Sequence, residues 1–324
     1  MVSIIIPFYN AEKTIESCIM SASAQSYENI EIIAINDGST DNSYRLLEKL
    51  SKNDQRIKVF TIENQGVSNA RNIGIKKSTG EFIRFMDADD RIEPDSIEKL
   101  INAQETSNSD LVIGGYSIIQ NDQVVSEVKW NKEEETTNIG EAIFWYKSKV
   151  LSPLWNKLFK RSLITNQFEM KYHVGEDLLF VLQYLENCDR ISFISDSIYL
   201  YNAPTGIVNL SLQYHTTNTC AIMDCWDLFF KSPEHKKEKD EALFTLLFMN
   251  LLKGIDAKTD KRSIENEIIR ITDYLEKNCS YGELNLPVQY RILPTMVKNK
   301  QNKMIIQYLR MLSLIKNEVK RCNH

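Results

Sequence analysis

The first ninety residues alternate short, predominantly apolar runs with segments of helical periodicity, and this alternation limits the fold more than any other feature. The apolar runs occupy residues 2–7, 30–35, 57–62 and 81–86. Runs of this length favour parallel strands covered on both faces, and the helical segments between them are their crossovers. The pattern predicts a parallel α/β sheet covered by helices.

Polar residues follow each of these predicted strands. They are Tyr9 with Asn10, Asp37, Asn64 and Asp87. Because the carboxyl ends of parallel strands share one edge of a sheet, these side chains are expected to converge where open α/β sheets bind ligands. Asn10 is also predicted to cap the helix that follows it.

The fourth strand ends in the segment Phe85–Asp90, which holds three carboxylates within four positions. Oxygen ligands this close together repel one another unless a divalent cation or a proton offsets the charge. An acidic turn before the next helix is the alternative, and Asp90 is assigned that structural role. An EF-hand loop is excluded, because the position that requires glycine holds Ile92.

The pattern changes beyond residue 110. An apolar strand over 110–114 precedes a hairpin around Asn121-Asp122, and a last strand is expected over 191–201. Between them, residues 131–138 read as an acidic loop and residues 139–147 as a helix. From about residue 212 the chain is expected to be wholly helical, with segments near 216–231, 236–257, 262–278 and 287–297.

Composition limits the class of protein. The chain of 324 residues has a net charge of −5, which argues against nucleic acid as a partner. None of its apolar runs approaches the roughly 20 residues that span a bilayer. The six cysteines have no metal-ligand spacing and no secretion signal precedes them, so free thiols in the cytoplasm are expected.

Residues 298–321 hold seven Lys or Arg and one Glu, with apolar residues along one side. A basic amphipathic helix of this kind can lie on an anionic membrane surface. A terminal helix packed on its own domain, with a solvated basic face, explains the pattern equally well. A homo-oligomer formed through the C-terminal helices is a further expectation.

Several segments together resemble the family 2 glycosyltransferases, in that family's order and spacing. They are Ser3–Asn10, Ile35–Asp41, Gly66–Asn72 and Phe85–Asp90, followed by Trp155–Phe159 and Gly175–Leu178. The resemblance covers residues 1–211 and leaves out the C-terminal helices. Each motif alone is weak, but their conjunction is specific.

The resemblance implies a GT-A fold, a Rossmann-like nucleotide-binding α/β domain, followed by an α-helical domain. Residues 1–100 would form the nucleotide-binding half, 101–211 the acceptor half and 212–324 the helical domain. The implied activity is that of a metal-dependent, inverting hexosyl- or N-acetylhexosaminyltransferase (EC 2.4). It would move a sugar from UDP to a hydroxyl of a glycan or lipid-linked acceptor in the synthesis of a bacterial capsule or exopolysaccharide.

The resemblance also assigns roles to individual residues. The nucleotide would be bound by Pro7 and Tyr9 at the base, Asp37 at the uracil ring, Asn64 and Arg71 along the diphosphate, and Asp87 at the ribose. Asp89, in the DXD motif, would ligate Mn²⁺ or Mg²⁺. Asp177, with Glu176 beside it, would be the catalytic base, and Trp155, Asn156 and Lys157 would shape the acceptor site.

Alternatives remain at this point. Glu176 and Asp177 also suit a plain helix-capping pair, and a degenerate module that binds nucleotide sugars without catalysis would keep the fold. A sugar-phosphate nucleotidyltransferase ranks lower, because residues 7–10 are not a glycine-rich phosphate loop. One departure from the family pattern lies in residues 201–211, which lack Arg and His; Thr205 or Ser211 would have to close over the diphosphate there.

Overall fold

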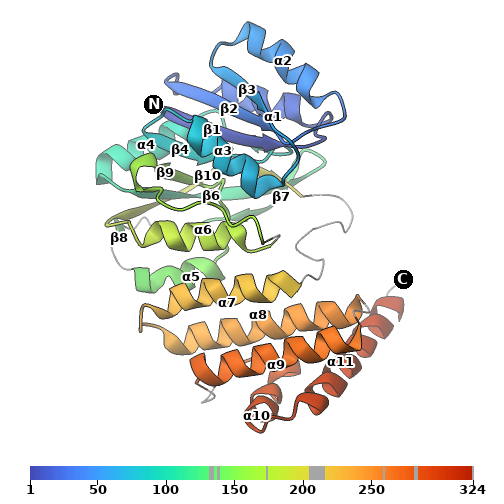
Figure 1. The fold of residues 1–324 in the computed structure, drawn as a ribbon. Coiled ribbons are helices and arrows are strands. Elements are labelled where there is room, and N and C mark those ends of the chain that lie inside the picture. The colour runs from blue at the N-terminus through green and yellow to red at the C-terminus, as the bar shows by residue number, and fades with distance from the viewer. Residues whose placement is uncertain are drawn as a thin grey trace. The chain divides into compact units, whose positions relative to one another are not determined.

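A computed structural model of the protein describes residues 1–130, 135–136, 139–172, 174–203, 216–257, 260–280 and 284–322. The chain forms two compact units. The first comprises Met1–Met170 with Glu176–Ile207, and the second comprises Lys171–Gly175 with Val208–His324. Figure 1 follows the chain through both units.

The first unit is built on one mixed sheet. Its strands are β1 (Val2–Phe8), β2 (Ile30–Asn36), β3 (Ile57–Thr61), β4 (Phe82–Phe85), β5 (Arg91–Ile92), β6 (Leu111–Gln120), β7 (Gln123–Val128), β8 (Glu135–Thr136), β9 (Lys157–Lys160) and β10 (Ile191–Asn202). They lie in the order β3-β2-β1-β4-β9-β6-β10-β5, while β7 pairs with β6 and β8 pairs with β10.

The helices of this unit occupy the connections between strands. They are α1 (Ile15–Ser23), α2 (Ser43–Asn53), α3 (Val67–Lys77), α4 (Ser96–Ser107), η1 (Ile139–Glu141), α5 (Ala142–Lys147), η2 (Arg161–Leu163) and α6 (Glu176–Leu185). The predicted parallel arrangement is confirmed, because β1 pairs in parallel with both β2 and β4, and β2 pairs in parallel with β3. The predicted hairpin at Asn121-Asp122 is confirmed by the antiparallel pairing of β6 and β7.

Three strands were not predicted. β8 lies within residues 131–138, which were expected to form an acidic loop, and pairs antiparallel with β10. β9 inserts between β4 and β6 and runs antiparallel to both. β5 has only two residues and pairs with β10. Strands this short carry little periodicity of their own, so the neighbours that they pair with decide whether they form.

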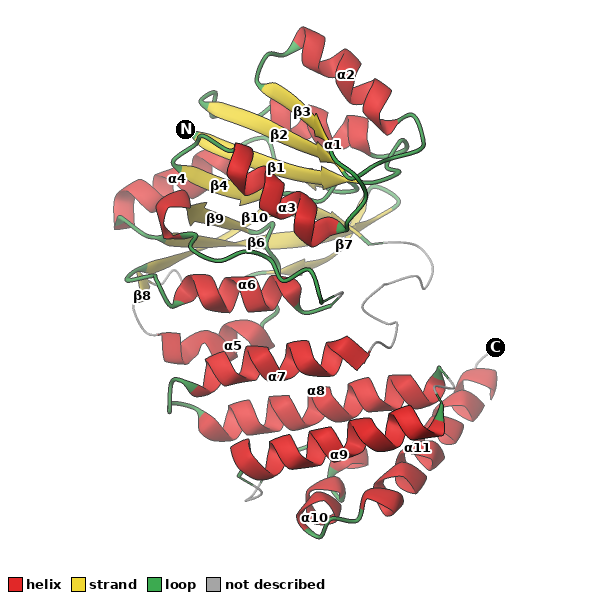
Figure 2. Ribbon diagram, in the orientation of Figure 1, coloured by secondary structure: helices red, strands yellow, loops and turns green. Residues whose placement is uncertain are grey.

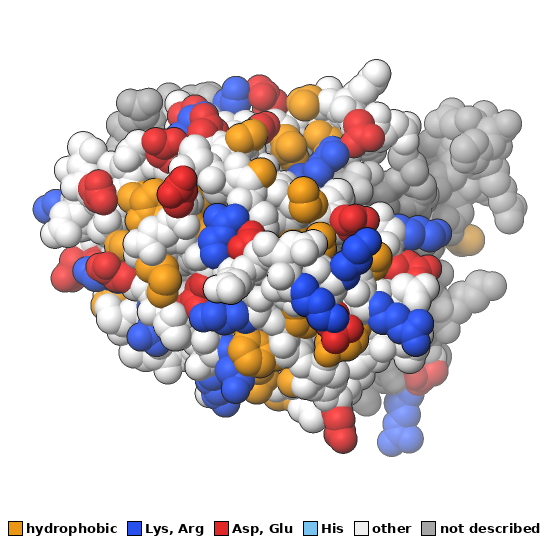
Figure 3. Space-filling model, turned by 90° about the horizontal axis from the view of Figure 1, so that it is seen from above, with side chains coloured by type: hydrophobic (Ala, Val, Ile, Leu, Met, Phe, Trp, Pro, Cys, Tyr) orange, Lys and Arg blue, Asp and Glu red, His pale blue; other side chains and the backbone are white. Residues whose placement is uncertain are grey.

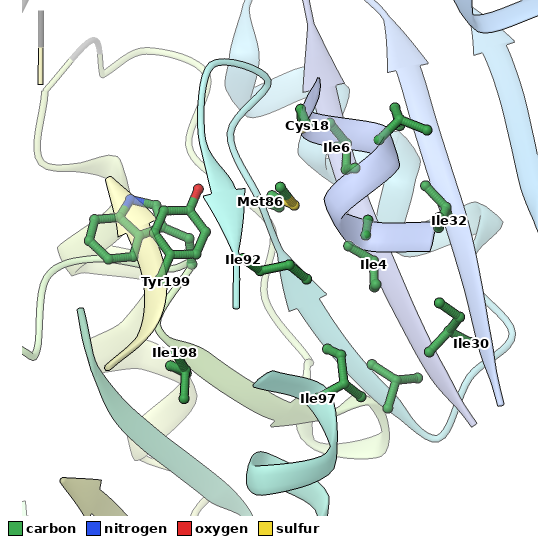
Figure 4. Close-up of a cluster of buried hydrophobic side chains, with 14 of the residues drawn as sticks. Ile4, Ile6, Cys18, Ile30, Ile32, Met86, Ile92, Ile97, Ile198 and Tyr199 are labelled. Atoms are coloured by element: carbon green, nitrogen blue, oxygen red, sulfur yellow. The ribbon is translucent and has the colours of Figure 1, made fainter. Parts of the chain in front are cut away.

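Helices cover both faces of the sheet (Figure 2). On one face, α1 and α4 contribute Ile15, Cys18, Ile97 and Leu100 to a buried cluster that includes Ile4 of β1. Figure 4 shows this cluster, to which β10 adds Ile198 and Tyr199. On the other face α3 packs closely, since a Cβ added at Gly74 would lie 2.3 Å from Ile5 Cγ2. Alternate residues of β1 therefore pack against the helices on opposite faces of the sheet.

The second unit is helical in the residues that the structure describes. Its helices are α7 (Thr216–Phe230), α8 (Lys236–Asp256), α9 (Lys261–Asn278), η4 (Val288–Tyr290), α10 (Leu293–Lys298) and α11 (Asn302–Cys322). They match the segments predicted from periodicity, except that the segment near 287–297 divides into η4 and α10. Among all described helices, none combines the length and the apolar character that crossing a bilayer requires.

The prediction that Asn10 caps α1 is wrong. The residue before α1 is Thr14, and Asn10 has a positive φ of 49°. The Asn10 Oδ1 atom instead accepts a hydrogen bond from Thr40 N at 2.8 Å. Asn10 thus ties the loop after β1 to the loop after β2, at the edge where the strand ends meet.

Surface charge on the face seen from above is mixed. Figure 3 shows acidic and basic side chains interspersed among small apolar patches over that face. Neither sign of charge dominates among the described side chains on that face.

Candidate active site

The carboxyl ends of β1, β2 and β4 bring the predicted polar residues to one edge of the sheet. Phe8 at the end of β1 lies beside Asn36 at the end of β2, and Asp87 follows β4. Pro7 is buried within β1, whereas Tyr9 is half exposed and Asn64 is exposed. The side chains of Tyr9 and Asn64 are therefore accessible to a ligand. Pro7 is enclosed within β1.

Asp37 anchors the start of α3. Its two carboxylate oxygens accept hydrogen bonds from the backbone N–H groups of Gln65 and Gly66, each at 2.9 Å. Gly66 has a φ of 91°, a conformation that favours glycine, and directly precedes the helix. Asp37 is buried. This contact sets the direction in which α3 leaves the sheet edge, and with it the position of Arg71.

Arg71 lies at the centre of a cluster of carboxylates. Its Nη1 atom lies 2.6 Å from Asp177 Oδ1 and 3.6 Å from Glu176 Oε1, and its Nη2 atom lies 3.3 Å from Asp87 Oδ1. Only 5% of the Arg71 side chain is exposed. The guanidinium predicted to face the diphosphate is thus bonded to the predicted catalytic base. The cluster joins α3, the end of β4 and the start of α6.

The ionisation of Asp177 is perturbed by this setting. Burial raises the pKa of Asp177 to about 7, Arg71 and Lys157 act to lower it, and Glu176 and Asp87 act to raise it. The same three carboxylates raise the pKa of Arg71 despite its burial, so the guanidinium stays charged. A carboxylate with a pKa near neutrality is suited to take a proton from a hydroxyl. Glu176 and Asp177 are also the first two residues of α6, where the helix dipole favours negative charge.

The three acids after β4 have different surroundings. Asp87 is partly exposed, and its backbone N–H donates to the Tyr199 hydroxyl at 3.0 Å. Asp89 is exposed. Asp90 is 1% exposed and accepts hydrogen bonds from the Tyr199 hydroxyl at 2.8 Å and from Asn202 N at 2.7 Å. Asp90 therefore fastens the end of β10 to the acidic segment, as its predicted structural role requires.

The residues after β4 suit a divalent cation that is coordinated partly by the protein and partly by a bound ligand. Desolvation and the neighbouring Asp87 raise the pKa of Asp89, so a nearby positive charge would stabilise its ionised form. Within the described part of the chain, no group of three or more His, Cys, Asp or Glu side chains could hold a metal ion by itself. A metal that keeps positions for diphosphate oxygens needs only one or two carboxylates from the protein. Asp89 fits that arrangement.

Replacing Asp90 with alanine is expected to lower the free energy of unfolding by about 2–3 kcal/mol, because the buried Tyr199 hydroxyl and the backbone N–H of Asn202 lose their acceptor. Replacing Asp89 with alanine is expected to change it by less than about 0.5 kcal/mol, since that side chain is exposed. Urea unfolding of the two variants measures both values. Equal losses would contradict the division of roles between these neighbours.

Trp155 is a core residue. It is 8% exposed and stacks on Tyr199 with ring centroids 4.2 Å apart, while Tyr116 meets it edge-on at 4.7 Å. Tyr201 lies parallel to it at 5.7 Å. Packing against Tyr199 gives Trp155 a structural role, and we do not propose that it contacts an acceptor.

Asn156 and Lys157 are fully buried, and their polar atoms bond within the protein. Asn156 Nδ2 donates to Gly114 O at 2.9 Å, and Lys157 Nζ donates to Val150 O at 2.7 Å, to Asn156 Oδ1 at 2.8 Å and to Pro153 O. Burial lowers the pKa of Lys157. We do not propose that these two residues contact an acceptor.

Three residues of the site were not singled out from the sequence. Asn72 follows Arg71 in α3, Phe168 lies under the Arg71 guanidinium, and Tyr199 links Asp87 to Asp90. Asn72 lies within a recognised motif but has no pattern that assigns it a role. The segment in which Thr205 and Ser211 were expected to close the site lies outside the described residues.

Known proteins resemble part of this chain. EpsJ of Bacillus subtilis, an uncharacterised glycosyltransferase, is 32% identical over 211 residues, which make up 62% of this chain and 60% of EpsJ. The stretches shared with other leading curated relatives span 31% and 63% of those proteins.

Solved structures show the same fold. Staphylococcus aureus TarS in complex with UDP-GlcNAc superposes with a TM-score of 0.74 at 21% identity, covering 98% of this chain and 91% of that one. The mannosyltransferase PcManGT of Pyrobaculum calidifontis, in complex with GDP-Man and Mn²⁺, gives a TM-score of 0.55 at 15% identity, with 98% and 86% covered. The predicted GT-A-like α/β fold followed by a helical region is confirmed.

The model of the family described as glycosyl transferase family 2 matches residues 3–167, about half of the chain. The matched residues include β1 to β4 and the acidic segment after β4. This protein therefore belongs to glycosyl transferase family 2.

Proposed function

We propose that the protein transfers a sugar from a UDP-sugar to a hydroxyl group of a glycan or lipid-linked acceptor, with inversion at the anomeric carbon, in the synthesis of a bacterial surface polysaccharide. The observation that carries this proposal is the Arg71 cluster. It joins Asp177, whose pKa is raised to about 7, to Asp87 at the edge of the sheet. Family membership supplies the reaction class.

The proposed reaction is a direct displacement. Asp177 takes the proton of the acceptor hydroxyl while the acceptor oxygen bonds to the anomeric carbon. The bond between the anomeric carbon and UDP breaks, and its electron pair leaves with UDP. Arg71 holds the Asp177 carboxylate through Nη1. Glu176, beside Asp177, adds negative charge that keeps the base basic. One base is sufficient, because it acts on the face opposite the leaving group.

Asp37, Asn64 and Asp87 are proposed to bind the nucleoside, with Tyr9 and Pro7 at the base. Asp89 is proposed to hold Mn²⁺ or Mg²⁺, with Asp87 nearby. Such a cation, when bound, offsets the charge that develops on the diphosphate as it leaves. The relatives named above support a nucleotide-sugar donor, and TarS supports UDP as its nucleotide.

The proposal is tested by incubating the protein with a panel of UDP-sugars in Mn²⁺ and measuring UDP release. Hydrolysis of one donor, abolished by EDTA, is the expected result. A nucleotidyltransferase would instead release pyrophosphate from UTP and a sugar phosphate. A non-catalytic module would bind UDP without turning over any donor.

We also propose that the enzyme works in the cytoplasm, on the membrane face where a lipid-linked acceptor is presented. Within the part of α11 whose side chains the structure describes, residues 302–315, exposed apolar side chains include Met304, Met311, Leu314 and Ile315. Lys303 and Arg310 are also exposed on this helix. Opposite them Ile305 and Leu309 are buried. A helix apolar on its outward side and basic on its flank suits an anionic bilayer.

Replacing Lys303 and Arg310 with glutamate is expected to reduce binding to phosphatidylglycerol vesicles at least about fivefold, since each basic residue near an anionic surface contributes on the order of 1 kcal/mol. Vesicle flotation measures the loss. Arg45 and Lys49 of α2, also exposed, provide the matched double replacement that should leave binding unchanged. If sedimentation shows a dimer and both double variants bind vesicles as the wild type does, the apolar face of α11 serves self-association instead.

A further inference from the structure

Asn72 holds the backbone of a residue far away in the chain. Its Nδ2 atom donates to Phe168 O at 3.0 Å, and its Oδ1 atom accepts from Phe168 N at 2.8 Å. Asn72 is 6% exposed, so both hydrogen bonds are shielded from water. A side-chain amide that pairs with both backbone groups of one residue replaces the neighbour that a strand would supply. Phe168 is thus fixed although it lies in neither a helix nor a strand.

The ring held in this way lies against the Arg71 guanidinium. Arg71 Cζ lies 5.4 Å from the centroid of the Phe168 ring. The ring is 2% exposed and stacks on Phe180 of α6 with centroids 4.0 Å apart and an interplanar angle of 6°. It also meets Phe85 at the end of β4 edge-on at 5.4 Å. The elements that carry Asp87 and Asp177 therefore both pack on this ring.

Arg71 needs such a support. Its Nη atoms bond to carboxylates, but among the residues that the structure describes its Nε atom has no hydrogen-bond partner. A guanidinium held only at its outer nitrogens can tilt, whereas an aromatic face next to it limits its plane and attracts its charge. The plane of the guanidinium decides which oxygen of Asp177 it binds.

We propose that Asn72 and Phe168 are positioning residues for the transfer reaction: Asn72 fixes Phe168, the Phe168 ring fixes the plane of Arg71, and Arg71 fixes the Asp177 carboxylate. This inference rests on the proposed function, in which Asp177 is the base. Neither residue is proposed to touch the substrates. The role of Asn72 explains why the motif Gly66–Asn72 places an amide directly after the arginine.

The charged groups that face Asp177 come from four elements. Arg71 approaches from α3 and Lys157 from β9, while Glu176 lies on α6 and Asp87 follows β4. Lys157 is committed to Val150 O and Asn156 Oδ1, so it cannot replace Arg71. If the guanidinium loses its fixed plane, Asp177 loses a hydrogen bond to its ionised form, and its pKa should rise.

The test replaces Phe168 with leucine, which keeps apolar bulk and removes the ring. We expect kcat to fall roughly 3- to 30-fold, the range that corresponds to one cation–π contact, while the donor KM changes less than about twofold. The acidic limb of the pH profile of kcat should move to higher pH. Phe168→Tyr, which restores the ring face, should recover kcat and the original profile.

Phe159→Leu is the matched control. Phe159 is a fully buried ring of the same aromatic cluster and meets Phe85 and Phe180 edge-on. It should lower the melting temperature as much as Phe168→Leu does and leave the pH profile unchanged. Asn72→Ala should reproduce the effects of Phe168→Leu. Identical pH profiles for Phe168→Leu and the wild type would overturn the proposal.

A measurement without turnover separates this inference from the proposed function. In protein labelled with ¹³C at aspartate carboxyl groups, the Asp177 signal is assigned by its loss in Asp177→Asn, and its titration is followed by NMR. Phe168→Leu should raise the pKa read from that signal, and Phe159→Leu should not. No turnover of any donor would refute the proposed function while this titration still reports on the positioning; an unmoved pKa in Phe168→Leu would refute the positioning alone.

Discussion

Replacing Asp177 with asparagine is expected to lower kcat about 10³-fold, within the 10²- to 10⁴-fold contribution of a general base. Asparagine keeps the shape of the side chain and an oxygen that can accept from Arg71 Nη1, now 2.6 Å from Asp177 Oδ1. It cannot take a proton at neutral pH. Binding of UDP should therefore remain within about twofold of the wild type, since binding and proton transfer use different groups.

Glu176→Gln is the control for this replacement. Glu176 is more distant from the guanidinium, with Oε1 3.6 Å from Arg71 Nη1, and is not assigned the proton. Its replacement removes one neighbouring charge and should cost about tenfold or less in kcat. Calorimetric titration of UDP and steady-state kinetics measure both quantities. Transfer by Asp177→Asn at the wild-type rate would show that another group is the base.

The pH dependence of the wild type follows from the same residue. Burial raises the pKa of Asp177 to about 7, and the base acts only when ionised. Turnover should consequently rise with pH through the region around 7, rather than around the value near 4 of an exposed aspartate. The rise should be absent from the residual activity of Asp177→Asn.

Replacing Arg71 with alanine is expected to lower the free energy of unfolding by about 3 kcal/mol, because it removes a buried guanidinium and leaves three partly buried carboxylates without their shared cation. Asp87 and Asp177 accept hydrogen bonds from this one guanidinium, and Glu176 forms a longer ion pair with it. Turnover should fall as well, since the base loses its orientation. Chemical unfolding and steady-state kinetics measure the two losses.

The loss of stability in Arg71→Ala should depend on pH in a defined direction. Arg71 lowers the pKa of Asp177, so its removal raises that pKa further above the unfolded value. A carboxyl group with a raised folded-state pKa contributes stability that is fully present below its unfolded pKa, near 4, and is lost as pH rises through the folded-state pKa. The variant should thus be closer to the wild type at pH 5 than at pH 8.

Arg56→Ala is the control for Arg71→Ala. Arg56 makes a close pair with Asp54, with Nη2 2.8 Å from Oδ2, but 35% of its side chain is exposed. Its loss should cost about 1 kcal/mol, as is usual for exposed pairs. A similar cost for the two arginines would mean that the cluster around Arg71 does not behave as a buried charge network.

The parallel part of the sheet could be predicted from the sequence because its signals are local. Four apolar runs, each followed by polar residues, define β1 to β4 and place Asp37 and Asp87 at one edge. The helices of the second unit were predicted for the same reason, since their periodicity repeats within each segment. The resemblance to the family then assigned roles to residues that the strand pattern had already predicted to lie at one edge of the sheet.

The short strands and the buried polar residues could not be predicted in this way. β9 forms because β4 and β6 offer it hydrogen bonds on both sides, and its own sequence gives no sign of them. Asn156 and Lys157 looked like acceptor ligands because polar residues in a recognised motif suggest a binding site. Their burial depends on carbonyl groups of Gly114 and Val150, which the chain supplies from other elements.

The acidic segment after β4 and the arginine of α3 show where the two sources of information divide. The sequence by itself determined that Asp87, Asp89 and Asp90 follow a buried strand and that Arg71 lies on a neighbouring helix. Only the tertiary structure decided that Arg71 binds Asp177, 106 positions further along the chain. The physical reason is that strand and helix patterns arise from neighbours in the chain, whereas a buried charge takes its partner from whatever the packed fold places within hydrogen-bond distance.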